Sequence, residues 1–371
     1  MRQRDTTRWG DFKNVTSLSE LETVDLGTDA LFTIEGDLPV DCMFKRGSKP
    51  TLHVCFNSAL TPGADYVLPV FTWTKATEHL KGSRLFISDP TMLLSPEIML
   101  GWYLGSRDHP VQELVEAVIV EVMARTGSTR VVFTGSSGGG FPALLYATKF
   151  DNSVACVNAP ATTLVDHHNR SVVENFCAIA NAGQPMETFP AILDITQNTG
   201  PGRGGKVIIT QNLNDHAFIE SHLQPFLKSR GLGWTGGSQA TPQVDLIVDD
   251  WGEGHVMPPR EVMRDTLSRI EDCPGGDFDF LWGTPEREPK CVIRKLSDGS
   301  FMAESSRCLP DCHYAFYLLK NGKKCETRSY KRSSSYIFRP RHGAGRYSLL
   351  LFERDENNQS TISRSPEIQI G

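Results

Sequence analysis

The stretch that decides the fold class is Val131-Val132-Phe133-Thr134-Gly135-Ser136-Ser137-Gly138-Gly139-Gly140-Phe141-Pro142-Ala143-Leu144-Leu145. An apolar run typical of a buried strand leads through Gly-x-Ser-x-Gly straight into an apolar helical run. Gly135, Ser137 and Gly139 hold the fixed places, because larger residues beside the serine would collide in so sharp a turn. The stretch therefore predicts a nucleophilic serine, Ser137, raised above the end of a central strand. The alternatives are a phosphate-binding glycine turn and plain strand–helix packing, whereas a P-loop is excluded because no Lys-Ser/Thr pair follows.

Outward from this turn, residues 30 to 272 alternate short β-rich runs with amphipathic helical runs. This alternation predicts an α/β fold, a mostly parallel sheet with helices on both faces, within a catalytic domain of residues 1–275. Short turns join the first two or three strands, so we expect these to pair antiparallel at one edge. The predicted strands are Ala30–Glu35, Val40–Arg46, Leu52–Ser58, Arg84–Ser88, Arg130–Thr134, Val154–Asn158, Lys206–Gln211 and Val244–Asp249. The predicted helices are His109–Arg125, Gly139–Lys149, Ala217–Ser229 and Pro259–Glu271.

One interval, from about residue 160 to 205, interrupts the alternation, because a single short helix would be enough to join the strands on either side. It contains one helical run, Ser171–Asn181, and a glycine-rich return at residues 200–205. An insertion of this length predicts a lid over a site, with loop decoration as the alternative.

After Cys273-Pro274-Gly275-Gly276 the helical runs stop. Residues 286–371 show short alternating strands separated by turn signals such as Asp298-Gly299, Asn321-Gly322 and Asn357-Asn358. Seven such strands predict a small all-β sandwich of the immunoglobulin-like or fibronectin type. They are Cys291–Lys295, Phe301–Ser305, Tyr314–Lys320, Cys325–Tyr330, Tyr336–Arg339, Gly345–Glu353 and Thr361–Ile370.

The two parts of the chain differ in charge. From Glu286 onward, 16 Lys+Arg oppose 10 Asp+Glu, a net charge of +6, which leaves −12 on the remainder. Six cations flank one hairpin and should gather at one side of its sheet: Lys320, Lys323, Lys324, Arg328, Lys331 and Arg332. We expect this basic face either to bind an anionic partner, such as an acidic glycan or a protein, or to be a solvated edge that discourages strand aggregation.

Length and composition exclude several other classes. The 371 residues suffice for two domains, and 39% hydrophobic residues suffice for a sizeable core. A net charge of −6 argues against a general nucleic-acid binder, and no apolar run approaches the ~20 residues of a membrane span. The first residues lead into no apolar segment, so we expect no secretory signal. The nine cysteines are scattered and odd in number, which favours reduced thiols and a cytoplasmic location.

A serine nucleophile needs a general base, and His255 is the best-placed histidine. It follows the last apolar strand in a glycine-flanked loop, Gly252-Glu253-Gly254-His255, that leads into the final helix. His216 and His222 fall at the start of a helix and within it, and His313 and His342 belong to the C-terminal part. The order serine, acid, histidine is one that serine enzymes of α/β architecture use.

The acid that orients the base should come from the loop after the preceding strand, where Asp215 lies. Its alternative role is to cap the helix that follows. Asp249 and Asp250 lie five or six residues before His255, on the strand that leads to it, and are poorly placed to reach behind its ring. Glu253 is a weaker competitor for the role of the acid.

An oxyanion hole would use backbone amides from two loops. One is the amide of Gly138, which directly follows the nucleophile, and the other is that of Ser58 or Ala59, after an early central strand.

These ordered motifs resemble the α/β-hydrolase superfamily over about residues 25 to 272. The segments Phe56-Asn57-Ser58-Ala59 and Gly101-Trp102-Tyr103-Leu104-Gly105, with the appended sandwich, look like the accessory-secretion and capsule-associated serine acyltransferases and esterases of bacteria. That resemblance implies a Ser–acid–His triad that handles O-acetyl groups on glycans.

Other candidate sites are weaker. Cys308, Cys312 and His313 could supply three metal ligands, but no second cluster accompanies them. Asp166-His167-His168 could also bind a metal, although such a pair on a polar segment is more often solvated. Trp102, Tyr103 and Trp251 could line a pocket, although aromatic residues near strand ends are mostly core. We expect no metal and no cofactor.

Three functions stay open at this point. The leading one is a serine hydrolase or acyltransferase that acts on an ester, small or glycan-linked, through an acyl-enzyme. The second is a prolyl-oligopeptidase-like peptidase, although no propeller repeat is visible. The third is a non-catalytic hydrolase-like scaffold that binds a partner.

Overall fold

The computed structural model describes residues 1–61, 65–197, 205–234, 236, 238–241, 243–273, 291–296, 299–305, 312–339, 343–354 and 360–370. The chain divides into two compact units, Met1–Trp282 and Gly283–Gly371. Each unit has its own hydrophobic core.

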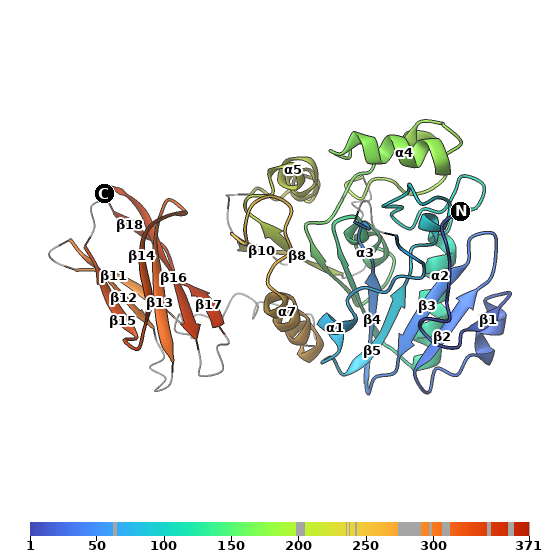
Figure 1. Ribbon diagram of the computed structural model, residues 1–371, viewed down its shortest axis with the longest axis horizontal. Coiled ribbons are helices and arrows are strands. Elements are labelled where there is room, and N and C mark those ends of the chain that lie inside the picture. The colour runs from blue at the N-terminus through green and yellow to red at the C-terminus, as the bar shows by residue number, and fades with distance from the viewer. Residues whose placement is uncertain are drawn as a thin grey trace. The chain divides into compact units, whose positions relative to one another are not determined.

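The first unit is built on one ten-stranded sheet with the order β1-β2-β3-β5-β4-β6-β7-β8-β10-β9 (Figure 1). From β5 to β10, neighbouring strands run parallel, and β2 pairs antiparallel with β3 at one side. The strands are β1 Lys13–Val15, β2 Ala30–Ile34, β3 Val40–Lys45, β4 Lys49–Phe56, β5 Gly82–Ile87, β6 Arg130–Ser136, β7 Ser153–Asn158, β8 Lys206–Asn212, β9 Gln239–Ala240 and β10 Val244–Asp249. The predicted fold class is confirmed.

The edge pairing was predicted correctly for two strands and wrongly for the third. Strand β4 does not pair with β3 but lies between β5 and β6, parallel to both. Its last six residues, from Thr51 to Phe56, are all buried. Such a strand must be covered on both faces, so it occupies the middle of the sheet.

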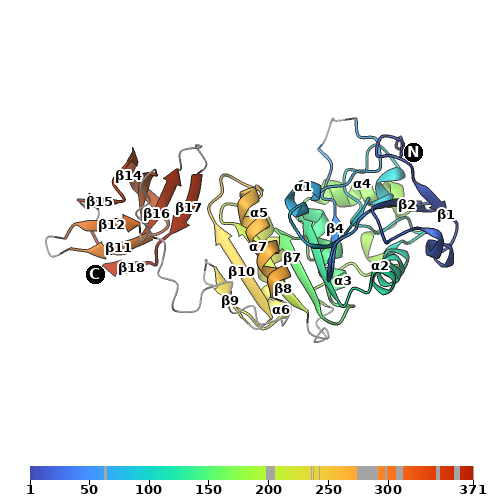
Figure 2. The ribbon, with the colours of Figure 1, turned by 90° about the horizontal axis from the view of Figure 1, so that it is seen from below.

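Helices cover both faces of this sheet (Figure 2). Alternate residues of β6 face opposite layers: Val131 and Phe133 join the core beneath α2, α3 and α6, and Val132 joins the core beneath α7. The helices are α1 Thr74–Thr77, α2 Gln112–Thr126, α3 Gly140–Ala147, α5 His216–Phe218, α6 Gln224–Ser229 and α7 Arg260–Asp272, with the π-helical turn η5 Ile219–Leu223 joining α5 to α6. The central strand β6 is therefore held rigidly from both sides.

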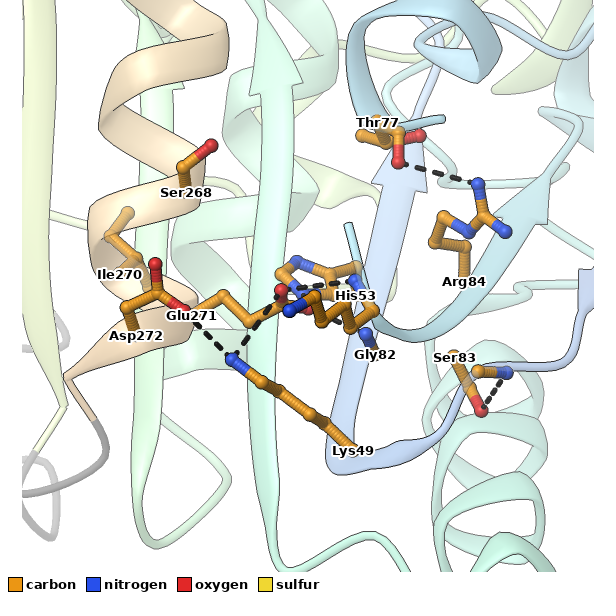
Figure 3. A network of polar contacts seen from close by, with 12 residues as sticks. Lys49, His53, Thr77, Gly82, Ser83, Arg84, Ser268, Ile270, Glu271 and Asp272 are labelled. Atoms are coloured by element: carbon orange, nitrogen blue, oxygen red, sulfur yellow. Dashed lines mark hydrogen bonds and ion pairs between the residues drawn. The ribbon is translucent and has the colours of Figure 1, made fainter. Parts of the chain in front are cut away.

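A buried polar network ties the end of α7 to the sheet (Figure 3). His53 of β4 is fully buried, and its Nε2 lies 3.3 Å from Glu271 Oε1. The backbone amides of Lys81 and Gly82 also donate to the Glu271 carboxylate. Lys49 lies at the rim and pairs with Asp272 over 2.7 Å. The carboxylate thus has three hydrogen-bond donors, which compensates for its burial.

The insertion between β7 and β8 contains the helix α4 Arg170–Ala180 and the short turn η4 Met186–Thr188. Within its described residues, 160–197, the only β contact is an isolated bridge between Thr163 and Asp194, so no second sheet forms there. Residues 200–204, where we predicted a glycine-rich return, lie outside the described residues. In Figure 1, α4 lies at the same end of the unit as α5.

The second unit consists of two antiparallel sheets. One has the order β11-β12-β15, and the other has the order β14-β13-β16-β17, with β18 also pairing to β16. Phe301 of the first sheet packs on Tyr347 of the second, with ring centroids 4.7 Å apart, so the two sheets share one core. The strands are β11 Cys291–Lys295, β12 Phe301–Ser305, β13 His313–Lys320, β14 Lys323–Lys331, β15 Ser335–Phe338, β16 Gly345–Arg354, β17 Ser360–Arg364 and β18 Ile368–Ile370. The predicted last strand, Thr361–Ile370, is split in two.

The turns of this unit follow the sequence signals where they can be seen. Asn321 and Gly322 have φ values of 49° and 77°, as a two-residue hairpin turn requires. Asp298, Asn357 and Asn358 lie outside the described residues.

Eight of the nine cysteines fall within the described residues, and all eight are free thiols. No described helix is both long and apolar enough to cross a membrane.

Candidate active site

Ser137 occupies the strand-to-helix turn that the sequence predicted. Strand β6 ends at Ser136, and the short helical turn η3 Ser137–Gly139 leads into α3. The φ angle of Ser137 is 52°, which is rare for a residue with a side chain and marks local strain. A Cβ on Gly135 would lie only 2.0 Å from the carbonyl oxygen of Gly139, and one on Gly139 would lie 2.6 Å from that of Asn57. The turn is therefore possible only with glycine at these positions.

His255 and Asp215 meet although 40 residues separate them in sequence. His255 Nδ1 lies 2.6 Å from Asp215 Oδ2. The second oxygen, Oδ1, accepts a hydrogen bond from the Phe218 amide over 3.4 Å. Asp215 therefore fills both roles considered for it, because one oxygen caps the helix while the other holds the imidazole.

A cavity of about 540 Å³ brings Ser137, Asp215 and His255 together. Ala59 also lines it, whereas Ser58 faces a neighbouring cavity. Apolar residues contribute much of its wall, among them Leu60, Met99, Leu100, Val172 and Phe218. In the described part of the chain, no hydrogen bond joins Ser137 Oγ to the His255 ring. Asp215 is only 3% exposed but the His255 side chain 39%, so the acid is hidden and the base faces the open cavity.

The sequence did not reveal the residues that hold the His255 loop in place. Asn212 Nδ2 donates to the carbonyl oxygens of Gly252 and Gly254, and Asn214 Nδ2 also donates to Gly252. The Phe218 ring stacks on His255, with centroids 4.1 Å apart. Only the position of the two asparagines, one at the end of strand β8 and one shortly after it, could have indicated such a role. The asparagines thus hold the backbone of the loop, and Phe218 packs on the imidazole itself.

Hydrogen bonds also hold the loop after β4, which we expected to supply an oxyanion amide. The Tyr103 hydroxyl accepts from the Asn57 amide over 2.8 Å and lies 2.6 Å from Asn57 Oδ1. Asp89 accepts from the Tyr103 amide, and burial raises the pKa of Asp89 to about 6. Within the described residues, no hydrogen bond engages the amides of Ser58 or Ala59. These two amides are thus available as donors beside the turn that holds Gly138.

The other acids and histidines weighed from the sequence lie elsewhere. Asp250 accepts from Asn214 Nδ2, and Glu253 is exposed in the loop. Asp249 accepts from the Asp250 amide. His216 lines the cavity from its rim, exposed to solvent. His313 belongs to β13 of the second unit, and His342 lies outside the described residues.

A second group of histidines lies against the same cavity. His167, His168 and His222 each offer a ring nitrogen, and these nitrogens lie within 4.8 Å of one another. Our expectation that His167 and His168 form a solvated pair is correct for His168 but wrong for His167, which is 3% exposed. Burial, with the neighbouring His168, lowers the pKa of His167 to about 4. Burial, with His167 and His168, lowers the pKa of His222 to about 2.

The hydrogen bonds of this histidine group do not suit a metal ion. The amides of Asn169 and Thr162 donate to Nδ1 of His167 and of His222, so each neutral ring carries its proton on Nε2. His222 Nε2 then donates to His168 Nδ1 over 3.2 Å. A ligating Nε2 would need the opposite tautomer, whose Nδ1 proton would face an amide proton. The group is therefore a set of hydrogen-bonded rings, of which His167 and His168 line the cavity.

The remaining candidates are structural or lie partly outside the described residues. Trp102 and Tyr103 are each 1% exposed and belong to the core, and Trp251 is half-buried. Cys312 is buried and His313 exposed, while Cys308 lies outside the described residues.

No protein-family model and no curated protein sequence matches the chain. Solved structures resemble it only distantly. The capsule O-acetyltransferase of Neisseria meningitidis serogroup A is 15% identical, with 68% of this chain and 99% of that chain covered and a TM-score of 0.48. An α/β serine hydrolase homologue from Coxiella burnetii is 15% identical, with 65% and 97% covered and a TM-score of 0.38.

A third similar structure is the Glycosylation Associate Protein (Gap123) complex from Streptococcus agalactiae. It is 15% identical, with 66% of this chain and 47% of that chain covered and a TM-score of 0.47.

Proposed function

We propose that this protein is a serine hydrolase or acyltransferase that cleaves or transfers an ester-linked acyl group. The observation that carries the proposal is the 2.6 Å contact between Asp215 Oδ2 and His255 Nδ1 in the cavity that Ser137 lines. A nucleophile, a base and an orienting acid from three separate loops form the constellation of acyl transfer.

In the proposed reaction, Ser137 Oγ attacks the acyl carbonyl carbon and its proton passes to His255 Nε2. Asp215 holds the Nδ1 proton and stabilises the imidazolium that forms. The negative charge on the carbonyl oxygen is taken up by the Gly138 amide and that of Ser58 or Ala59. The bond to the leaving group then breaks, and the leaving oxygen or sulfur takes the proton from His255. An acyl group remains on Ser137.

The acyl-enzyme is resolved by a second nucleophile, either water or an acceptor hydroxyl, which His255 deprotonates in turn. We propose a glycan hydroxyl as the acceptor, because the resemblance seen in the sequence implies one. We also propose a cytoplasmic location, because the described cysteines are free thiols. Hydrolysis and transfer use the same chemistry, so the proposal covers both.

The decisive experiment is covalent labelling with a fluorophosphonate probe, followed by turnover of p-nitrophenyl acetate and of longer p-nitrophenyl esters. We expect labelling of the wild type at Ser137 and none of Ser137→Ala. A wild-type protein that neither reacts with the probe nor turns over any ester would instead be the non-catalytic scaffold. Turnover of peptide anilides in preference to esters would favour the peptidase.

A further inference from the structure

The hydrogen bonds of the histidine group determine which nitrogen of His168 carries the proton. The Thr162 amide donates to His222 Nδ1 over 3.3 Å, so the proton of the His222 ring is on Nε2. His222 Nε2 then donates to His168 Nδ1 over 3.2 Å. Because its Nδ1 accepts, a neutral His168 carries its own proton on Nε2. A backbone amide thus fixes, through two rings, the tautomer of His168.

The same arrangement keeps the His168 ring uncharged. A protonated ring would carry a proton on Nδ1, directed at the Nε2 proton of His222, and His222 is fully buried. Burial, opposed in part by the nearby Asp215, also lowers the pKa of His168. At neutral pH, Nε2 of His168 is therefore a hydrogen-bond donor without a charge.

His168 lines the cavity that Ser137 and His255 also line, and its side chain is exposed to solvent. In the described part of the chain, no hydrogen bond engages His168 Nε2. Two ring contacts hold the imidazole, with the His167 centroid at 4.5 Å and the Phe218 centroid at 4.6 Å. Phe218 also stacks on His255, so one aromatic ring contacts both His168 and the proposed base.

A second donor without a partner belongs to the same group of rings. His167 also lines the cavity, and its buried Nε2, which carries the proton, has no hydrogen-bond acceptor among the described residues. Trp102 packs against His167 with ring centroids 5.6 Å apart, and its indole Nε1 is likewise buried with no acceptor in that part of the chain. A buried donor without an acceptor costs free energy, so contact with an acceptor atom of a bound molecule would be favourable.

The charges of the lining indicate what kind of acceptor suits these donors. None of the described lining residues is a lysine or an arginine, and the one carboxylate among them, Asp215, is held by His255. An anion would therefore meet no cation of fixed charge, and a cation would meet N–H donors. An uncharged oxygen, as in a hydroxyl, ether or carbonyl group, is the acceptor that matches.

We propose that His168 Nε2 donates a hydrogen bond to an uncharged oxygen of the substrate outside the reacting ester, and that this bond determines which substrates the site prefers. The inference rests on the proposed function and adds a specificity-determining residue to it. His222 is a positioning residue, since it acts only by setting the tautomer of His168. Two parts of the substrate can carry the oxygen, the acyl group and the acceptor alcohol, and the test treats them separately.

The test uses pairs of compounds in which one oxygen replaces one methylene group, so that size and shape are kept. For the acyl group, p-nitrophenyl pentanoate and p-nitrophenyl 3-methoxypropanoate are compared by kcat/KM. For the acceptor, butan-1-ol and 2-methoxyethanol are compared by the yield of acetyl ester from p-nitrophenyl acetate. In at least one pair, we expect the preference for the oxygen compound to be about fivefold or more greater in the wild type than in His168→Phe, as one hydrogen bond would give. Phenylalanine keeps the ring and removes the donor.

Two further variants and a direct measurement sharpen the test. His168→Gln should keep part of the preference, because its amide oxygen can accept from His222 while its nitrogen donates. His216→Phe, at a second exposed histidine that lines the cavity, is the matched control and should keep all of it. Two-bond ¹H–¹⁵N correlation spectra of protein labelled in its histidines, assigned with His168→Gln, should show the His168 proton on Nε2 at neutral pH.

Two results would overturn the inference. One is an equal preference in the wild type and in His168→Phe for both pairs of compounds, and the other is a His168 proton on Nδ1. The proposed function is judged separately, by turnover of p-nitrophenyl acetate and its loss in Ser137→Ala. If that turnover is present while His168→Phe changes neither preference, the inference about His168 fails and the serine chemistry stands.

Discussion

Two histidine–carboxylate pairs of the first unit have similar chemistry but differ in how far solvent reaches the histidine. In one, Asp215 holds His255 at 2.6 Å, and 39% of the His255 side chain is exposed toward the cavity that Ser137 lines. In the other, Glu271 lies 3.3 Å from His53, whose side chain is fully buried (Figure 3). Three donors satisfy Glu271, namely the His53 ring and the backbone amides of Lys81 and Gly82.

The two pairs differ in the access of solvent and substrate to the histidine ring and not in the histidine–carboxylate contact. A general base needs a free ring nitrogen that a substrate can reach, and His255 keeps Nε2 for that purpose. His53 uses Nε2 for Glu271, and its Nδ1 is buried with no hydrogen-bond partner among the described residues. We therefore expect the first pair to control activity and the second to control stability, and the following experiments test that division.

The largest effect is expected for Ser137→Ala. Loss of the nucleophile should abolish covalent labelling and lower kcat for small esters by about four to six orders of magnitude, with the unfolding midpoint little changed. Steady-state turnover and chemical denaturation measure the two quantities. Ser136→Ala is the matched control, because its hydroxyl bonds to Met257 and faces the other cavity. It should cost less than tenfold, and an equal loss in both variants would contradict the assignment of Ser137.

His255→Ala should lower kcat nearly as far as the loss of Ser137, because members of such a triad act as a unit. Asp215→Asn should cost less, about two to four orders of magnitude, since the acid mainly orients the ring. Pre-steady-state labelling rates would report both. If Asp250→Asn lowers the rate more than Asp215→Asn does, the acid has been assigned wrongly.

Glu271→Ala should lower stability and leave activity nearly unchanged. Its removal leaves the amides of Lys81 and Gly82 without an acceptor, so the free energy of unfolding should fall by about 3 kcal/mol. Specific activity of the folded fraction should stay within twofold of wild type. Asp272→Ala, whose side chain is 70% exposed, is the neighbouring control and should cost below about 1 kcal/mol. Equal losses in urea unfolding would mean that the buried contacts do not matter.

Acid should weaken the buried pair. Burial alone would raise the pKa of Glu271, but hydrogen bonds from His53 and two amides lower it to about 2. Burial lowers the pKa of His53. Both groups therefore bind protons more readily in the unfolded chain, so their stabilisation is complete above about pH 7 and declines as the pH falls toward 2.

Urea unfolding at pH 7, 5 and 4 would measure this decline, and Glu271→Ala should flatten it. A variant that loses stability with acid as steeply as the wild type would show that other groups dominate.

The smallest effect concerns the basic hairpin of the second unit. Lys323, Lys324 and Arg328 lie on β14, at the end of its sheet's strand order, and Lys324 and Arg328 each lie 4.8 Å from a tyrosine ring centre. Replacing all three with glutamate should weaken retention on immobilised heparin severalfold, because the reversed charges repel a polyanion. The loss should be measured at low salt, since exposed charges are screened beyond ~10 Å at 0.1 M salt. Turnover of small esters should not change. Unaltered retention would leave the cations as protection of a sheet edge.

Much of the fold could be predicted from the sequence because its signals are local. Alternating apolar runs marked the strands on both sides of Ser137, and Asn321-Gly322 marked a hairpin turn that the structure contains. The short edge strands β1 and β9 were missed, since three and two residues are too few for a periodic pattern. The place of β4 in the sheet was wrong, because strand order depends on which faces are covered and not on sequence proximity.

The candidate site likewise combines local features, which the sequence shows, with long-range contacts, which it does not. Gly-x-Ser-x-Gly and the order of Ser137, Asp215 and His255 can be seen in the sequence, because the turn depends on residues a few positions apart. The role of Tyr103 in bracing the Asn57 loop could not be seen, because its hydroxyl meets a strand end 46 residues away.

The sequence by itself determined the strained turn at Ser137, the alternation of strands and helices, and the change to an all-β unit. Each depends on steric and hydrophobic preferences that act within a few residues. Only the tertiary structure decided that Asp215 meets His255 across 40 residues and that Glu271 meets His53 across 218. It also decided that neighbouring serines face different cavities. Strand order and packing bring distant loops together and determine which side chains solvent can reach, and with that, which histidine is free to take a proton.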